Sequence, residues 1–153
     1  HPILDISYDW SAETGKLALT INQTQDTGAG VPVFRLPVKI GITTSAGKVV
    51  EDIWLNDQSQ TFEFDVAKQP LMVRFDEGDI LLKEWTLDKP VSELLYQLDH
   101  DSLVGRLWAI GELRNHVDDL AVQSALRNTV NSDAAEAVRI EALDVLSTRE
   151  VEN

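Results

Sequence analysis

Residues 80–113 read ILLKEWTLDKPVSELLYQLDHDSLVGRLWAIGEL, and the hydrophobic period of the chain changes within this stretch, at Pro90. Upstream, apolar residues occupy every second position, as at 17, 19 and 21; downstream they recur every three or four, as at 103, 107, 110 and 113. A period of two is typical of a half-buried strand, and a period near 3.6 of an amphipathic helix. The sequence therefore predicts a mixed, β-then-α chain: an antiparallel β-sandwich domain in residues 1–89 and a helical segment in residues 90–153.

Turn residues divide the β half into about seven short runs. The predicted strands are residues 3–8, 16–23, 33–42, 48–55, 61–66, 71–75 and 80–87. Glycine with Asp or Thr fills several gaps between them, as tight turns require, and turns at this spacing are typical of a sandwich. Pro37 lies inside the longest run and cannot donate a ladder hydrogen bond, so we expect it at an edge, a bulge or a bend.

The α half predicts helices at residues 91–98, 103–115, 118–130 and 134–147, with Asp118 and Asp133 at helix N-termini. It also contains an internal repeat with the pattern Arg-x-x-Ala-x-x-x-Leu. The matched pairs, each 33 positions apart, are Arg106 and Arg139, Leu107 and Ile140, Ala109 and Ala142, Ile110 and Leu143, and Leu113 and Leu146. A fixed period of this size favours a solenoid of stacked antiparallel helix pairs, similar to HEAT repeats, with a generic bundle as the alternative.

We expect this chain to be part of a longer polypeptide. It begins at His1, which favours excision or processing, and the solenoid interpretation leaves the last helix without its partner, so we expect sequence beyond Asn153.

The charge of the chain bears on its partners. Its net charge is −13, with 14 acids against 8 bases in residues 1–90 and 12 against 5 in residues 91–153. An acidic surface repels phosphate backbones and anionic lipid, so we expect neither nucleic acid nor a membrane as partner. The chain contains no cysteine, which excludes disulfides and cysteine-ligated metals and favours a cytoplasmic location.

The candidate metal ligands and nucleophiles do not form a recognisable catalytic pattern. The histidines His1, His100 and His116 lack metal-ligand spacing, and no His-Glu-x-x-His, Gly-x-Ser-x-Gly or phosphate-binding glycine motif occurs. We interpret residues 28–30 (GAG) as a loop, and Asp99 and Asp101 as helix caps. The acids at 76, 77 and 79 lack the full ladder of a calcium loop and predict a β-turn. We therefore assign no catalytic, cofactor-binding or metal-binding residue to this chain.

The tryptophans Trp10, Trp54, Trp85 and Trp108 suggest two roles. If their rings were exposed and coplanar, the tryptophans would form a platform that binds carbohydrate. Each lies in an apolar periodic run, however, and this favours packing in the core. Trp85 and Trp108 are candidates for a seam between the two domains.

The strand sequences resemble one known family. Residues 19–25 (LTINQTQ) and 32–38 (PVFRLPV) are similar to the "Leu-x-Gln-x-Gln … Pro-x-x-x-Pro" stretch of the aminopeptidase N family of zinc peptidases. Residues 1–4 (HPIL) resemble the entry into the same β-sandwich domain, and residues 75–76 and 81–83 its closing strands. The helical repeat resembles the start of the HEAT-like region that follows in this family.

The resemblance covers nearly the whole chain but none of the catalytic motifs. The zinc-binding His-Glu-x-x-His and the Gly-x-Met-Glu-Asn substrate motif have no match here. The resemblance thus implies a non-catalytic accessory fragment, whose partners are the upstream catalytic domain and the peptide substrates of the parent enzyme, with zinc in the missing domain. A non-enzymatic scaffold of the same architecture is the alternative, and a carbohydrate-binding sandwich the third possibility.

Overall fold

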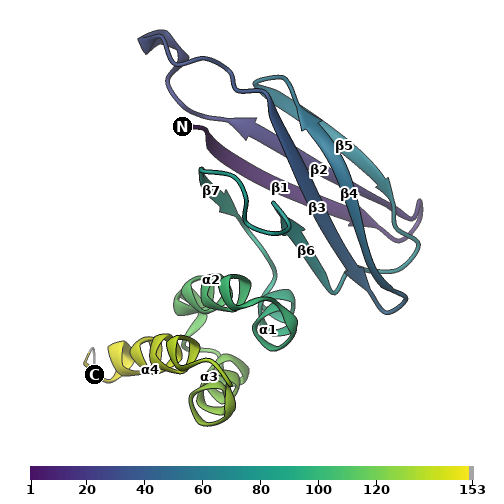
Figure 1. Ribbon diagram of the computed structural model, residues 1–153. Helices are drawn as coiled ribbons and strands as arrows, with labels where there is room; N and C mark the ends of the chain where they lie inside the picture. The colour runs from purple at the N-terminus through teal and green to yellow at the C-terminus, as the bar shows by residue number, and fades with distance from the viewer. Residues whose placement is uncertain (152–153) are drawn as a thin grey trace. The chain divides into compact units, whose positions relative to one another are not determined.

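The computed structural model describes residues 1–151, without the side chains of residues 29 and 149–151, and contains seven strands followed by four α-helices (Figure 1). The chain divides into two compact units: the sandwich unit, His1–Asp88, and the helical unit, which begins at Lys89. The predicted order, β first and then α, is confirmed.

The seven strands of the sandwich unit form two sheets. They are β1 (Ile3–Ser11), β2 (Lys16–Gln23), β3 (Leu36–Thr44), β4 (Gly47–Leu55), β5 (Ser59–Asp65), β6 (Met72–Phe75) and β7 (Glu84–Leu87). The larger sheet has the order β5-β2-β1-β7 and the smaller one the order β4-β3-β6, as Figure 1 shows. The core contains the alternating residues of both sheets: in β2, for example, Leu17, Leu19 and Ile21 are fully buried while their neighbours are not.

One strand pair departs from the predicted antiparallel arrangement. β1 pairs with β7 in parallel, from Ile3 with Glu84 to Ile6 with Leu87, whereas the other pairs are antiparallel. Parallel neighbours need a long crossover connection, and here the connection is the rest of the sandwich. The first and last strands of the unit therefore lie side by side.

Strand boundaries also differ from those predicted. β1 runs to Ser11 because its hairpin with β2 continues to the Ser11–Lys16 pair. β3 begins at Leu36 rather than at 33, since the preceding segment is held by side-chain hydrogen bonds described below. β7 begins at Glu84 rather than at 80, and Ile80 and Leu82 lie in a loop, 73% and 85% exposed.

Pro37 lies at a local edge inside a central strand. β3 has β4 on one side and β6 on the other, but β6 pairs only with residues 40–43 of β3. Pro37 is opposite Trp54 of β4 and beyond the end of β6, so a proline is tolerated there without losing a ladder hydrogen bond to β6.

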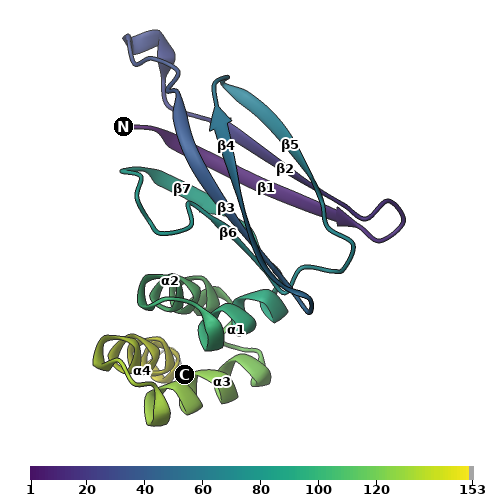
Figure 2. The same cartoon turned by 45° about the vertical axis from the view of Figure 1, so that its right-hand side comes forward.

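The helical unit contains α1 (Val91–His100), α2 (Leu103–Leu113), α3 (Leu120–Ser132) and α4 (Glu136–Val151), with a short 3₁₀ helix at Arg114–His116. Helices α1 and α3 form one layer and α2 and α4 the other (Figure 2). Helices α2 and α4, which carry the repeated residues, pack against each other. The two helix pairs agree with a stacked arrangement, and their relation to HEAT repeats stays a prediction.

The helix caps are close to the predicted positions. Asp119, one residue after the predicted Asp118, is the N-cap of α3, where its carboxylate accepts the amide of Ala121 at 2.7 Å. Asp133 accepts the amide of Ala135 at 2.8 Å before α4, as expected. Asp101 is the C-cap of α1, but Asp99 lies inside that helix, so its predicted capping role is wrong.

Candidate functional site

The three histidines lie in separate surroundings. Nε2 of His1 is 2.6 Å from a carboxylate oxygen of Glu84 in the sandwich unit. His100 stacks on Tyr96, with ring centroids 4.0 Å apart, and His116 ends the 3₁₀ helix. No group of three or more potential ligand residues that could hold a metal ion occurs among residues 1–151.

The acidic turn at residues 76–79 belongs to a buried ionic cluster. The carboxylate of Asp76 accepts hydrogen bonds from the backbone amides of Ile80 and Leu81 and from Nζ of Lys83, the last at 2.5 Å. Both side chains of this pair are nearly inaccessible, at 2% for Asp76 and 6% for Lys83. A few residues away, Arg74 pairs with Asp79 at 2.8 Å. The acids of this turn are thus bound by protein cations and amides, which agrees with a structural turn rather than a calcium loop.

The protonation of Asp76 follows from these contacts. Burial acts to raise the pKa of its carboxyl, but the hydrogen bond and positive charge of Lys83, together with the amides of Leu81 and Ile80, outweigh burial and leave the pKa below the ordinary value of 3.8. Asp76 therefore remains charged at neutral pH. A permanently ionised, fully partnered carboxylate fixes a loop and is unsuited to proton transfer.

The motif that resembles the aminopeptidase N family has a structural role. The side-chain amide of Gln23 donates to the carbonyl of Phe34 at 2.8 Å, and its oxygen accepts the amide of the same residue at 2.8 Å. Gln25 donates to Gln23 at 3.0 Å and to the carbonyl of Pro32 at 3.1 Å. Both glutamines are buried. The pair thus holds the segment between β2 and β3 in place of a ladder of strand hydrogen bonds.

The tryptophans do not form an exposed platform. Trp54 is 50% exposed, but the guanidinium of Arg35 lies 4.4 Å from its ring centroid. Trp10 donates to the carbonyl of Val66, and Trp85 and Trp108 are half-buried. Trp108 packs against the helical core, as predicted for core aromatics. The predicted seam between Trp85 and Trp108 stays a prediction.

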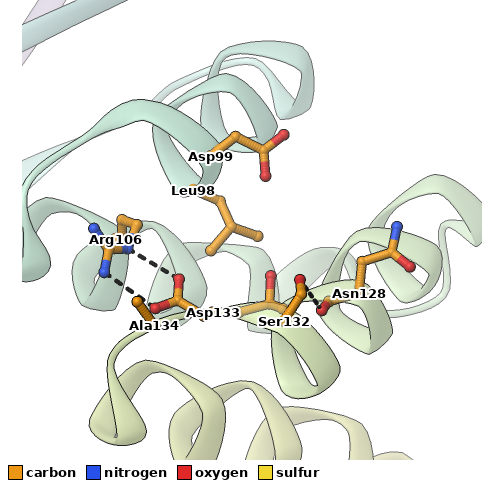
Figure 3. Close-up of a pocket in the computed structure, with 8 residues that line it drawn as sticks. Leu98, Asp99, Arg106, Asn128, Ser132, Asp133 and Ala134 are labelled. Carbon is orange, nitrogen blue, oxygen red and sulfur yellow. Dashed lines mark hydrogen bonds and ion pairs between the residues drawn. The ribbon is translucent and has the colours of Figure 1, made fainter.

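A polar pocket of about 320 Å³ lies in the helical unit between the ends of α1 and α3 and the start of α4 (Figure 3). Its lining residues are Leu98, Asp99, Arg106, Asn128, Thr129, Ser132, Asp133 and Ala134. The guanidinium of Arg106 pairs with Asp133, with Nη2 to Oδ1 at 3.1 Å. Figure 3 shows the carboxylate of Asp99 on the opposite wall, directed away from this pair.

Most polar groups of this pocket already have partners. Ser132 and Thr129 donate to backbone carbonyls of their own helix, and Asp133 is used by both Arg106 and the amide of Ala135. Sequence reasoning identified Arg106 through the repeat but missed its pairing with Asp133, since 27 positions separate the two. The pocket is best explained as the junction at which Arg106 links α2 to the α3–α4 connection.

The repeated arginines occupy equivalent positions. Nη1 of Arg106 donates to the carbonyl of Asp101 at 3.0 Å, and Nη1 of Arg139 donates to the carbonyls of Asp133 at 2.7 Å and Ala134 at 3.3 Å. Asp101 and Ala134 each lie five positions before their arginine, in the turn that precedes the helix. The repeat seen in the sequence thus has a counterpart in backbone contacts.

No helix within residues 1–151 combines the length and the apolar character needed to cross a membrane.

Comparison with known proteins gives a structural match without a sequence match. No protein family matches the sequence, and no curated protein does. Among solved structures, the chain is similar to the crystal structure of Legionella pneumophila aminopeptidase A in complex with aspartic acid, with a TM-score of 0.68 and 13% sequence identity. The match covers 92% of this chain, so both units take part in it. At this identity the likeness shows the fold alone.

The match covers only 18% of the aminopeptidase chain. The present chain therefore spans under a fifth of the length of the structure that it resembles. Its likeness is to one region of a much larger enzyme.

Proposed function

We propose that this chain is a non-catalytic accessory region of a zinc-dependent aminopeptidase of the aminopeptidase N type. The observation that carries the proposal is the structural likeness, which includes both units and a small part of the aminopeptidase chain. The sequence resemblance at Gln23 and Gln25 supports the same relationship and does not depend on the structural likeness. Both glutamines are buried and hold the segment between β2 and β3.

The chemistry of the chain agrees with an accessory role. The buried ionisable side chains in the described residues of the sandwich unit are Asp76, Lys83 and Arg74; Asp76 pairs with Lys83, and Arg74 pairs with Asp79. Proton transfer and metal binding need groups that are free to exchange protons or ligands, and these paired groups are not. The sandwich would act as a spacer and the helical unit as a cover of the peptide cleft, in a protein that we place in the cytoplasm.

Activity and metal content test the proposal. We expect the 153-residue chain to show neither hydrolysis of amino-acid p-nitroanilides nor bound zinc, and the longer polypeptide that contains it to show both. Stoichiometric zinc or turnover in the chain alone would contradict the proposal. Inactivity of the longer polypeptide would favour the scaffold instead.

A further inference from the structure

A second cavity, in the sandwich unit, has a different chemistry from the polar pocket. It has a volume of about 180 Å³ and opens where β4 and β5, the terminal strands of the two sheets, approach each other. Its lining includes the apolar residues Ile42, Val49, Phe64, Val66 and Ala67. Ligand sites for whole small molecules occupy roughly 300–1,000 Å³. The cavity is therefore too small for most such ligands and matches a single side chain.

Glu51 also lines this cavity, and its position is unusual. Along β4 it alternates with Val49 and Ile53, and it lies opposite the fully buried Ile40 of β3, so it belongs to the inward face of the strand. Within residues 1–151 no hydrogen bond or ion pair is formed by its carboxylate. The nearby carboxylate of Asp65, in contrast, pairs with Lys16 at 2.6 Å. An apolar cavity thus has one carboxylate that remains available to a cation.

The backbone beside the cavity is available as well. β4 is the last strand of the smaller sheet, and residues 47–52 are all exposed. A terminal strand presents a row of backbone N–H and C=O groups that an added strand can pair with. Such an added strand directs alternate side chains toward the inner and outer faces of the sheet. One of these side chains would then reach the cavity.

We propose that the β4 edge binds an extended peptide segment whose lysine side chain enters the cavity. The aliphatic stem of lysine would pack against Val49 and Phe64, and its ammonium group would pair with Glu51. The net charge of −13 favours a cationic partner, because the field of the chain attracts it over a distance. Lys68 also lines this cavity, and its positive charge opposes an incoming ammonium group, so the attraction of Glu51 has to exceed that repulsion.

An inward charge on a terminal strand has a second physical explanation. Such charges can prevent two copies of a protein from pairing edge to edge, without binding anything. The two explanations differ in outcome. Edge protection predicts that removing the charge causes self-association, whereas a binding site predicts that a lysine peptide is bound and that its affinity depends on the charge.

The test uses a blocked heptapeptide of alternating threonine and valine with one central lysine, and the same peptide with norleucine in that place. We expect the lysine peptide to shift the amide resonances of β4 and Phe64, and Glu51→Gln to weaken its binding about tenfold. The norleucine peptide should bind about tenfold more weakly to the unchanged protein. Glu63→Gln, which alters an exposed carboxylate on β5, is the matched control and should leave the affinity unchanged.

Three results would overturn the proposal: no shift of β4 resonances at millimolar peptide, equal affinity of the two peptides, or equal affinity of Glu51→Gln and the unchanged protein. Self-association of Glu51→Gln without peptide binding by the original protein would assign Glu51 to edge protection. The peptide comparison needs no variant, so it decides the matter even if Glu51→Gln folds poorly.

Discussion

Each unit buries one lysine near an aromatic ring, and the two lysines differ in what they hold together. Lys83 of the sandwich unit lies 5.5 Å from the ring centroid of Trp85, and Lys89 of the helical unit lies 5.4 Å from that of Trp108. The carboxylate partner of Lys83 is Asp76, which also fixes the loop through two amides. The partner of Lys89 is Glu93, four positions away, with Gln97 as a second acceptor.

The two units use their buried polar groups differently. Asp76 has φ of 55°, a conformation that non-glycine residues rarely adopt, and its hydrogen bonds with the residues after it maintain the loop. Glu93 lies in the first turn of α1, where the helix dipole and local contacts favour a carboxylate even without the lysine. We therefore expect the sandwich to depend more strongly on its buried pair than the helices do on theirs.

The largest effect should come from removing one lysine at a time. Lys83→Met should destabilise the sandwich unit by about 3–5 kcal/mol, because it leaves the Asp76 carboxylate buried without its cation. Lys89→Met should cost the helical unit only about 2 kcal/mol, since the helix dipole supports Glu93. Urea unfolding followed by residue-resolved amide signals measures both units separately.

The matched control for the lysines is Lys16→Met. Lys16 pairs with Asp65 at the surface, where the side chains are 44% and 88% exposed and water screens the pair, so its loss should lower the free energy of unfolding least of the three. An equal loss for Lys83→Met and Lys89→Met would remove the distinction between the units.

Removing the hydrogen bonds of the uncharged Gln23 side chain should give the next largest loss of stability. Gln23→Leu keeps the approximate volume of the side chain but deprives both the amide and the carbonyl of Phe34 of their partner, so we expect a loss of about 3 kcal/mol. Hydrogen exchange of the Phe34 amide should accelerate more than that of β2 itself. Gln58→Leu, at an exposed position, should change the stability by about 0.5 kcal/mol at most.

The smallest effect should be a dependence on pH. Because the pKa of Asp76 is lower in the folded chain than its ordinary value of 3.8, its contribution to stability is complete above that value. The contribution is lost as the pH falls through the lower, folded pKa. The free energy of unfolding should therefore decrease as the pH falls below about 4, and less so in Asp76→Asn. A pH dependence that is the same in Asp76→Asn and in the exposed-site control Asp57→Asn would show that Asp76 does not carry it.

Hydrophobic periodicity predicts most of the fold, and its failures have physical reasons. Alternation at Ile80 and Leu82 predicts a strand, but the positive φ of Asp76 and Asp79 and the ionic cluster form a loop there instead. The parallel pairing of β1 with β7 joins the two ends of the sandwich unit, and no local pattern encodes so distant a contact. Helices, whose contacts are local, are predicted more closely.

The sequence predicts less of the candidate sites than of the fold. Lys83 and Asp76 look like surface residues in sequence, because burial of a charged pair depends on contacts that only the fold provides. The sequence does not mark Glu51 as a site residue. Its position, two residues from both Val49 and Ile53, already places it on the inward face of its strand. The paired glutamines were found through the family resemblance, but their role in holding the β2–β3 connection required the structure.

The most direct test of the accessory role is a side-by-side measurement of zinc content and aminopeptidase turnover in the 153-residue chain and in the longer polypeptide that the proposed role implies. We expect zinc and turnover in the longer polypeptide and neither in the chain alone. Stoichiometric zinc or turnover in the isolated chain would contradict the accessory role.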